Sequence, residues 1–186
     1  MKLIEMDLDT LIKQTRKAEA NPGGGAILIL MSNLATNLIL MMDMDDWGSL
    51  ENKANVSRET LLKHSETLKE LMQDDVENFN QLLDKLKEKK ASQDDYILAA
   101  KALLSMVEAN TESLQVLSFY LENGKKSTIT DGQIANNLLR EAIYASIPTI
   151  DINIKYTDEV IDYKKIKNKV DSLYENNKAI IERRIK

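Results

Sequence analysis

Apolar residues recur every three to four positions over most of the chain, which is the period of an amphipathic α-helix. This pattern predicts a first helix over residues 3–20, a second over residues 26–44 and a break over residues 45–49. The second segment is apolar on nearly every side. Its polar residues group on one side of a helix, and they are Ser32, Asn33, Thr36 and Asn37. We expect this segment to be a buried central helix.

Two long amphipathic helices follow the break. One begins at residue 49 or 57 and continues to about residue 86, and the other continues to an Asn-Gly pair at residue 123. Ser92 and Asp95 are suitably spaced to cap the start of the second of these helices. Because only a short turn separates the two helices, they must be antiparallel neighbours.

The last third of the chain predicts two more helices. One begins near residue 130 and meets Pro148, which should kink or interrupt it, and the other extends from about residue 158 to the end. Residues 150–154 alternate as a strand would, but no other segment offers a partner strand, so we expect helix or irregular structure there. The pattern therefore predicts an all-α fold, a single antiparallel bundle of about five to six helices in one domain over residues 1–186.

Composition and charge narrow the class of protein. With 43% hydrophobic and 30% charged residues the chain is globular, and its formal charge of −5 argues against nucleic-acid binding. The absence of cysteine excludes disulfides and thiol catalysis. Residues 26–42 are at the short limit of a membrane span and carry the polar stripe, and charged residues among the first nine argue against a cleavable signal. We expect a cytoplasmic protein that does not enter a membrane.

Few side chains are suited to catalysis. His64 is the only histidine, and among Lys63, Ser65 and Glu66 we interpret it as a surface residue. Without paired histidines or cysteines we expect no metal site, and the triple glycine lacks the lysine of a phosphate-binding loop. Carboxylates, amides and backbone donors remain.

The run from Asn21 to Gly25 opens the apolar helix with three consecutive glycines. Free N–H groups at a helix N-terminus attract anions and carbonyl oxygens, so this run is a candidate binding element. A tight turn between two helices is the alternative explanation, because glycine and proline are common in turns.

Two acids are candidates for a functional role. Asp75 lies between Met72 and Phe79 on the apolar stripe of its helix, which is not where solvation alone would place a carboxylate. Asp131 begins a helix, where an aspartate is also the expected capping residue. For both, structural pairing or capping is the alternative.

The order of these motifs resembles that of the cyclodeaminase/cyclohydrolase family of tetrahydrofolate enzymes, which act as formiminotetrahydrofolate cyclodeaminases or methenyltetrahydrofolate cyclohydrolases. The resemblance extends over residues 18–162. The segments that carry it are Asn21–Gly25 (an Asn/Thr-Pro-Gly-Gly-Gly turn), Asp75–Phe79 (Asp-x-x-Ala-Phe), Thr130-Asp131 (a Ser-Asp pair), Ile152–Ile154 (Ile-Asn-Leu) and the trailing Asp162.

The resemblance implies a homodimer with the fold of the formiminotransferase-cyclodeaminase C-terminal domain. Its substrate would be 5-formimino- or 5,10-methenyl-tetrahydrofolate, with no metal and no tightly bound cofactor. Asp75 and Asp131 would be catalytic, one moving a proton and the other stabilising a cation, if the bundle brings them together. The substrate-binding residues would be Asn21, Pro22, Gly23, Gly24, Gly25, Phe79, Thr130 and Asn153.

Three positions depart from the family pattern. Ala26 replaces a serine, Thr149 replaces an asparagine and Asn78 replaces an alanine. Two other functions therefore stay open: a relative that binds a folate or another small ligand without catalysis, and a structural bundle whose apolar second helix is a protein interface.

Overall fold

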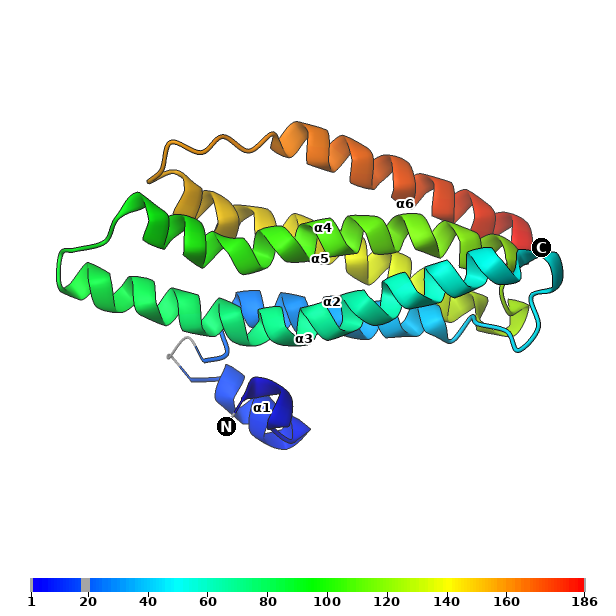
Figure 1. The fold of residues 1–186 in the computed structure, drawn as a ribbon, viewed down its shortest axis with the longest axis horizontal. Coiled ribbons are helices and arrows are strands. Elements are labelled where there is room, and N and C mark those ends of the chain that lie inside the picture. Colours follow the sequence, from blue (N-terminus) through cyan, green and yellow to red (C-terminus); the bar gives the residue numbers. More distant parts are fainter. Residues whose placement is uncertain (1, 18–20, 186) are drawn as a thin grey trace.

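The computed structural model describes residues 2–17 and 21–185, and within these ranges it contains six α-helices, three short 3-10 helices and no strand (Figure 1). The all-α prediction is confirmed. In chain order the elements are η1 (Leu3–Glu5), α1 (Leu8–Thr15), α2 (Gly24–Leu40), η2 (Gly48–Leu50), α3 (Glu51–Lys87), α4 (Gln93–Asn123), η3 (Lys126–Thr128), α5 (Ile129–Ile154) and α6 (Tyr163–Ile185).

Helices α2 to α5 form an antiparallel bundle in which α2 and α4 lie diagonally and each packs against both α3 and α5. Helix α6 covers α4 and α5, whereas α1 lies outside the bundle near the N-terminal end of α2 (Figure 1). The core is built from large aliphatic side chains with almost no exposed surface, among them Ile29, Ile39, Leu61, Leu68, Leu103, Leu114, Leu117 and Leu139.

The sequence pattern predicted one helix over residues 3–20, but the structure does not have a single helix there. A 3-10 turn over residues 3–5 precedes α1, and residues 18–20 of the predicted helix lie outside the described residues. The reason is Asp7, whose side chain accepts a hydrogen bond from the Thr10 backbone N–H at 2.9 Å. This N-cap starts a new helix at Leu8 and separates it from the preceding turn.

The predicted boundaries of the two long helices are largely confirmed. Helix α3 begins at Glu51, between the two predicted starts, and α4 begins after Ser92 with the predicted capping box. In that box the Asp95 carboxylate accepts the Ser92 backbone N–H at 2.9 Å. Helix α4 ends at Asn123 as predicted, since the next residue, Gly124, has an extended backbone with φ −77° and ψ −174°. A Cβ atom at Gly124 would lie 2.8 Å from the Tyr120 carbonyl oxygen.

Pro148 was expected to kink or interrupt its helix. It does not interrupt α5, so the expectation of a break was wrong. The helix continues to Ile154, and residues 150–154 are helical, as expected. Proline removes only one backbone donor, and Pro148 itself is exposed. Ile143 and Ile150 on either side of it are buried, and we attribute the continuity of the helix to their packing.

The polar residues of α2 are divided between two sides of the helix. Ser32 is fully buried and accepts a hydrogen bond from the Asn110 side chain of α4 at 2.8 Å. Asn37 instead donates to the Ser65 hydroxyl of α3 at 2.9 Å. These bonds tie α2 to two neighbours. None of the helices in the described part of the chain combines the length and the apolarity that a membrane span needs.

Candidate functional site

Asp75 is a buried carboxylate that meets the N-terminus of α2. Its position on α3 between the buried Met72 and Val76 leaves it only 9% exposed. It reaches α2 because Gly25 has no side chain there: a Cβ atom would lie 2.6 Å from Asp75 Oδ2. The Ala26 backbone N–H donates a hydrogen bond to this carboxyl group.

Burial raises the pKa of Asp75 to about 6, although the Ala26 hydrogen bond acts in the opposite direction. Among the residues that the structure describes, no lysine, arginine or histidine forms an ion pair with it. A carboxyl group with this pKa exchanges a proton readily near neutral pH, as a general acid or base must.

The Asp75 carboxyl lines a pocket of about 200 Å³ where α2 and α4 begin and α5 ends. One wall is apolar and includes Phe79. The polar groups are Asp75, Thr149 and Asn153, and the Asn153 amide donates to the Thr149 carbonyl at 3.2 Å. The complete lining is Gly23, Gly24, Gly25, Asp75, Val76, Phe79, Ala99, Thr149 and Asn153.

Most of the residues predicted to bind substrate are brought together here. The glycines, Phe79 and Asn153 all line the pocket, while the exposed Asn21 and the buried Pro22 immediately precede it. Val76 and Ala99 were missed, because small apolar residues on a helix carry no sequence signal that separates a pocket wall from ordinary core.

Thr130 and Asp131 lie elsewhere, in the first turn of α5. Thr149, which marks the pocket, follows Asp131 by five helical turns, a rise of about 27 Å. The expectation that the bundle brings Asp75 and Asp131 together was therefore wrong. Helix α5 therefore holds the two motifs at opposite ends of the bundle.

The model of the formiminotransferase-cyclodeaminase family matches residues 7–172, nearly the whole chain. The chain belongs to the formiminotransferase-cyclodeaminase family. Among solved structures, formiminotetrahydrofolate cyclodeaminase from Thermotoga maritima is similar, with a TM-score of 0.87 and 18% sequence identity over 97% of this chain and 98% of that one. A search of curated proteins gave no match. The family resemblance and the bundle fold of its cyclodeaminase domain are thus confirmed.

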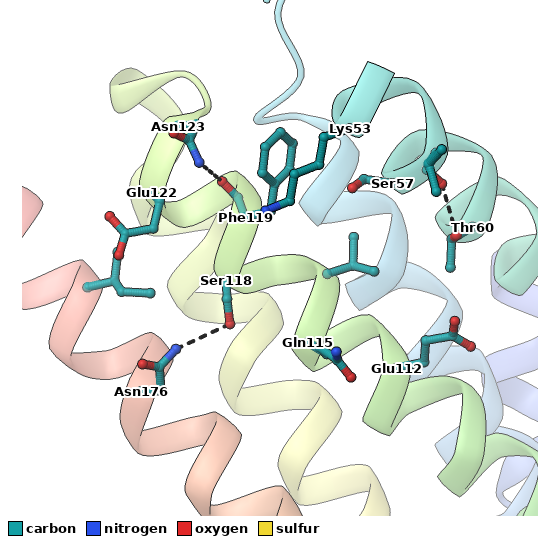
Figure 2. A pocket seen from close by; sticks show the side chains of 13 residues that line it. Lys53, Ser57, Thr60, Glu112, Gln115, Ser118, Phe119, Glu122, Asn123 and Asn176 are labelled. Carbon is teal, nitrogen blue, oxygen red and sulfur yellow. Dashed lines mark hydrogen bonds between the residues drawn. The ribbon is translucent and has the colours of Figure 1, made fainter. Parts of the chain in front are cut away.

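This family member also has a larger hollow, of about 470 Å³, between α3, α4 and α6 (Figure 2). Its carboxylates are already paired: Glu122 lies 2.6 Å from the Arg183 guanidinium, and Glu112 contacts His64. Lys53 lies 5.0 Å from the centre of the Phe119 ring. The Asp75 pocket is the better candidate for the functional site, because no cationic side chain of the described residues pairs with its carboxylate.

His64 is buried, so its interpretation as a surface residue was wrong. It is 8% exposed and lies between α3 and α4, with Nδ1 3.0 Å from the Ser113 hydroxyl and Nε2 3.0 Å from Glu112 Oε2. The three side chains resemble a hydrolytic triad in type. However, Ser113 has no exposed surface, so a substrate cannot reach its hydroxyl, and the cluster is structural.

Residues 2–17 and 21–185 contain no group of three or more histidine, cysteine or acidic side chains arranged to hold a metal ion. The Asp75 pocket contributes a single carboxylate and one side-chain amide. What it offers chemically is a proton carrier, a negative charge when ionised, and backbone donors at a helix N-terminus.

Proposed function

We propose that this chain is an enzyme of tetrahydrofolate one-carbon chemistry, acting on 5-formimino- or 5,10-methenyl-tetrahydrofolate. The observation that carries the proposal is Asp75, a 9% exposed carboxylate with its pKa raised to about 6, facing the glycine-opened N-terminus of α2. Family membership supports the class of reaction.

The pocket suits the reacting end of a folate rather than the whole molecule. Its volume of about 200 Å³ is below the range of roughly 300–1,000 Å³ that is usual for complete ligand sites. Phe79 offers a flat apolar surface for the pterin ring, and the free N–H groups of Gly24 and Gly25 suit a carbonyl oxygen. The aminobenzoate and glutamate parts would extend outside.

In the cyclodeaminase reaction, N10 attacks the carbon of the protonated formimino group, an amidinium cation, and forms a tetrahedral centre. The proton that N10 loses must reach the departing nitrogen, and the C–N bond then breaks to release ammonia and leave the methenyl cation. One carboxylate that accepts and returns a proton is enough for this sequence. We assign that role to Asp75, whose ionised form also stabilises the adjacent cation.

In the cyclohydrolase reaction, water attacks the methenyl carbon and loses a proton. N5 takes up a proton and the new hydroxyl group loses one as the bond between N5 and that carbon breaks, which leaves 10-formyl-tetrahydrofolate. The tetrahedral carbon and the neighbouring cation are shared with the first reaction, so the same carboxylate serves both. Independence from metals, a cytoplasmic location and a homodimer belong to this proposal as predictions.

A second candidate is a family member that binds folate without turning it over. Two departures from the family pattern favour it. Thr149 lines the pocket with a hydroxyl where the family has an asparagine amide, and Ala26, next to the lining Gly25, lacks the hydroxyl of the family's serine. Calorimetric titration with 5-formyl-tetrahydrofolate measures binding, and its comparison with turnover separates the two functions.

The test of catalysis is to add 5,10-methenyl-tetrahydrofolate to the purified chain and to follow the loss of its near-ultraviolet absorbance. We expect Asp75→Asn to lower the rate by about 100-fold or more, the usual loss of a general acid–base group. Asp74→Asn is the matched control, since this neighbouring carboxylate is exposed and does not line the pocket. Equal rates for Asp75→Asn and wild type would remove Asp75 from the reaction.

A further inference from the structure

The hydroxyl of Thr149 on α5 is bonded differently from the hydroxyls of four threonines in other helices. Each of those four donates to the carbonyl oxygen four residues earlier, at 2.7–2.9 Å, and they are Thr15, Thr36, Thr60 and Thr111. This is a common bond for a threonine inside a helix, because the carbonyl of the preceding turn is within its reach. Thr149 forms no such bond to Ala145, and within the described residues its hydroxyl has no partner.

This hydroxyl belongs to the lining of the Asp75 pocket. Among the lining residues, only Asp75, Thr149 and Asn153 have polar side chains. Asn153 already donates an amide N–H to the Thr149 carbonyl at 3.2 Å, and Asp75 accepts the Ala26 backbone N–H. The Thr149 hydroxyl is therefore the lining group that can still donate one hydrogen bond and accept others.

A water molecule is the ligand that suits these groups. A bound water needs two to four polar partners and roughly 30 Å³, and the pocket of about 200 Å³ has room for one beside the reacting end of a ligand. Ionised Asp75 can accept a proton from this water, and the Thr149 hydroxyl can orient it. Because threonine is branched at Cβ, rotation about χ1 is restricted, so its hydroxyl is held in few orientations.

We propose that Thr149 and Asp75 together hold the attacking water for hydrolysis of 5,10-methenyl-tetrahydrofolate, so that this chain is a hydrolase that forms 10-formyl-tetrahydrofolate. The inference rests on the proposed function, of which it selects one of the two reactions. Ammonia release consumes no water, whereas a water held at the methenyl carbon carries the reaction on to the formyl product. In this scheme Asp75 moves the proton and Thr149 is a positioning residue.

The protons and charges of this reaction balance with these two residues. The water oxygen bonds to the methenyl carbon, one water proton passes to Asp75, and the positive charge shared by N5 and N10 is neutralised. Asp75 then gives this proton to N5 as the bond between N5 and the carbon breaks. The second water proton leaves for solvent as the formyl C=O bond forms. Thr149 exchanges no proton in these steps.

The kinetic test compares Thr149→Val with Thr149→Ser. Valine keeps the shape of threonine but removes the hydroxyl, so we expect kcat for methenyl hydrolysis to fall about tenfold with little change in KM, because the water and not the folate loses a partner. Serine keeps the hydroxyl and should retain most of the rate. An equal loss in both variants, or a higher KM with an unchanged kcat, would overturn the proposal.

Thr60→Val is the matched control, because it makes the same change in a threonine whose hydroxyl is already bonded to the Val56 carbonyl at 2.9 Å. Thr60 precedes Asp75 on α3 by about four helical turns, a rise of roughly 22 Å, so it is far from the pocket. This variant should keep both kcat and KM. A fall in kcat as large as that of Thr149→Val would show that the effect is not specific to the pocket and would overturn the proposal.

A second substrate distinguishes this inference from the proposed function. The wild type is given 5-formimino- and 5,10-methenyl-tetrahydrofolate separately, and both ammonia and the methenyl absorbance are followed. Loss of the methenyl absorbance faster than in buffer alone supports the water site. Ammonia release with accumulation of the methenyl form would overturn the inference and leave the proposed function intact. No reaction of either substrate would refute the proposed function, and the inference with it.

A high-resolution crystal structure tests the water without any assay of activity. We expect an ordered water at about 2.7–3.0 Å from both the Asp75 carboxylate and the Thr149 hydroxyl in the wild type. It should be absent or displaced in Thr149→Val. A Thr149 hydroxyl bonded to a protein carbonyl instead, or no water shared by the two side chains, would overturn the proposal.

Discussion

Gly25 lies directly against the Asp75 carboxyl group, which leaves no room for a side chain at position 25. A Cβ atom on Gly25 would be 2.6 Å from Asp75 Oδ2 and 2.8 Å from Cγ, much closer than van der Waals contact allows. The glycine run and the buried acid, far apart in the sequence, are therefore one structural unit. The acid receives a backbone N–H from the helix that the glycines open.

We predict that Gly25→Ala destabilises the protein by about 1–3 kcal/mol and abolishes turnover, because the methyl group displaces the Asp75 carboxylate. Gly24→Ala is the matched control, since a Cβ atom there meets nothing within 4 Å. It should leave stability unchanged or raise it by up to about 1 kcal/mol. Thermal denaturation and the absorbance assay measure both effects. Equal behaviour of the two variants would contradict the close contact.

Asp75→Asn should make the fold more stable at neutral pH, and the gain should depend on pH. Because burial raises the pKa of Asp75 to about 6 from its ordinary value of 3.8, the native state keeps a proton that the unfolded chain releases. Wild-type stability therefore falls as the pH rises from about 4 to about 6. Above that range the ionised, buried Asp75 lowers the free energy of unfolding of the wild type by about 3 kcal/mol.

Denaturant unfolding of wild type and Asp75→Asn across this range measures the effect. The difference in unfolding free energy should be near zero at the acid end and should reach its plateau above about pH 6. A difference that does not vary with pH would show that the carboxyl is solvated in the folded protein.

The helices of the bundle could be predicted from sequence because most of them bury one apolar side and because capping residues mark their ends. Two elements of the candidate site also had visible signals: an acid on an apolar stripe, and consecutive glycines at a helix start. His64 had a signal that was overlooked. It lies three residues after Leu61 and four before Leu68, both fully buried, so helical spacing places it on the inner side.

The separation of Asp131 from the pocket had a signal that was overlooked. The helix predicted from about residue 130 to Pro148 already extends over roughly 27 Å at 1.5 Å per residue, so the Thr130-Asp131 and Ile152–Ile154 motifs lie at its two ends. The pocket walls at Val76 and Ala99 could not be predicted, because they depend on how α3 and α4 meet.

Asn177 should be the polar residue that fixes α6 to the bundle. Its amide donates to the Leu114 carbonyl and to the Asn136 side chain, both at 3.0 Å, and its oxygen accepts the Ser118 hydroxyl at 2.6 Å. Asn177→Ala strands these buried partners, so we expect a loss of about 2–3 kcal/mol in urea unfolding. Asn176→Ala is the control, because that side chain is exposed and should change stability by less than about 0.5 kcal/mol. Equal losses would show that Asn177 has no special role.

Asp43 should stabilise the connection between α2 and α3, and its contribution should disappear in acid. Its carboxylate accepts hydrogen bonds from Trp47 Nε1 at 2.9 Å and from Arg58 Nη2 at 3.0 Å. Burial acts to raise the pKa of Asp43, but the bonds from Arg58 and Trp47 outweigh it and hold that pKa below its ordinary value. The ionised Asp43 carboxylate therefore stabilises the fold fully at pH values above its ordinary pKa. This stabilisation is lost as the pH falls through the lowered pKa that Asp43 has in the folded protein.

We accordingly expect Asp43→Asn to lower the free energy of unfolding by about 1–3 kcal/mol near pH 7, since it weakens hydrogen bonds to a charged partner. The difference in unfolding free energy between wild type and Asp43→Asn should narrow as the pH falls below about 4, because protonation then removes the charge from the wild-type side chain as well. Asp45→Asn, an exposed carboxylate in the same segment, should change little at either pH. Urea unfolding at the two pH values measures the gap, and a constant gap would mean that the ionised form of Asp43 makes no contribution to stability.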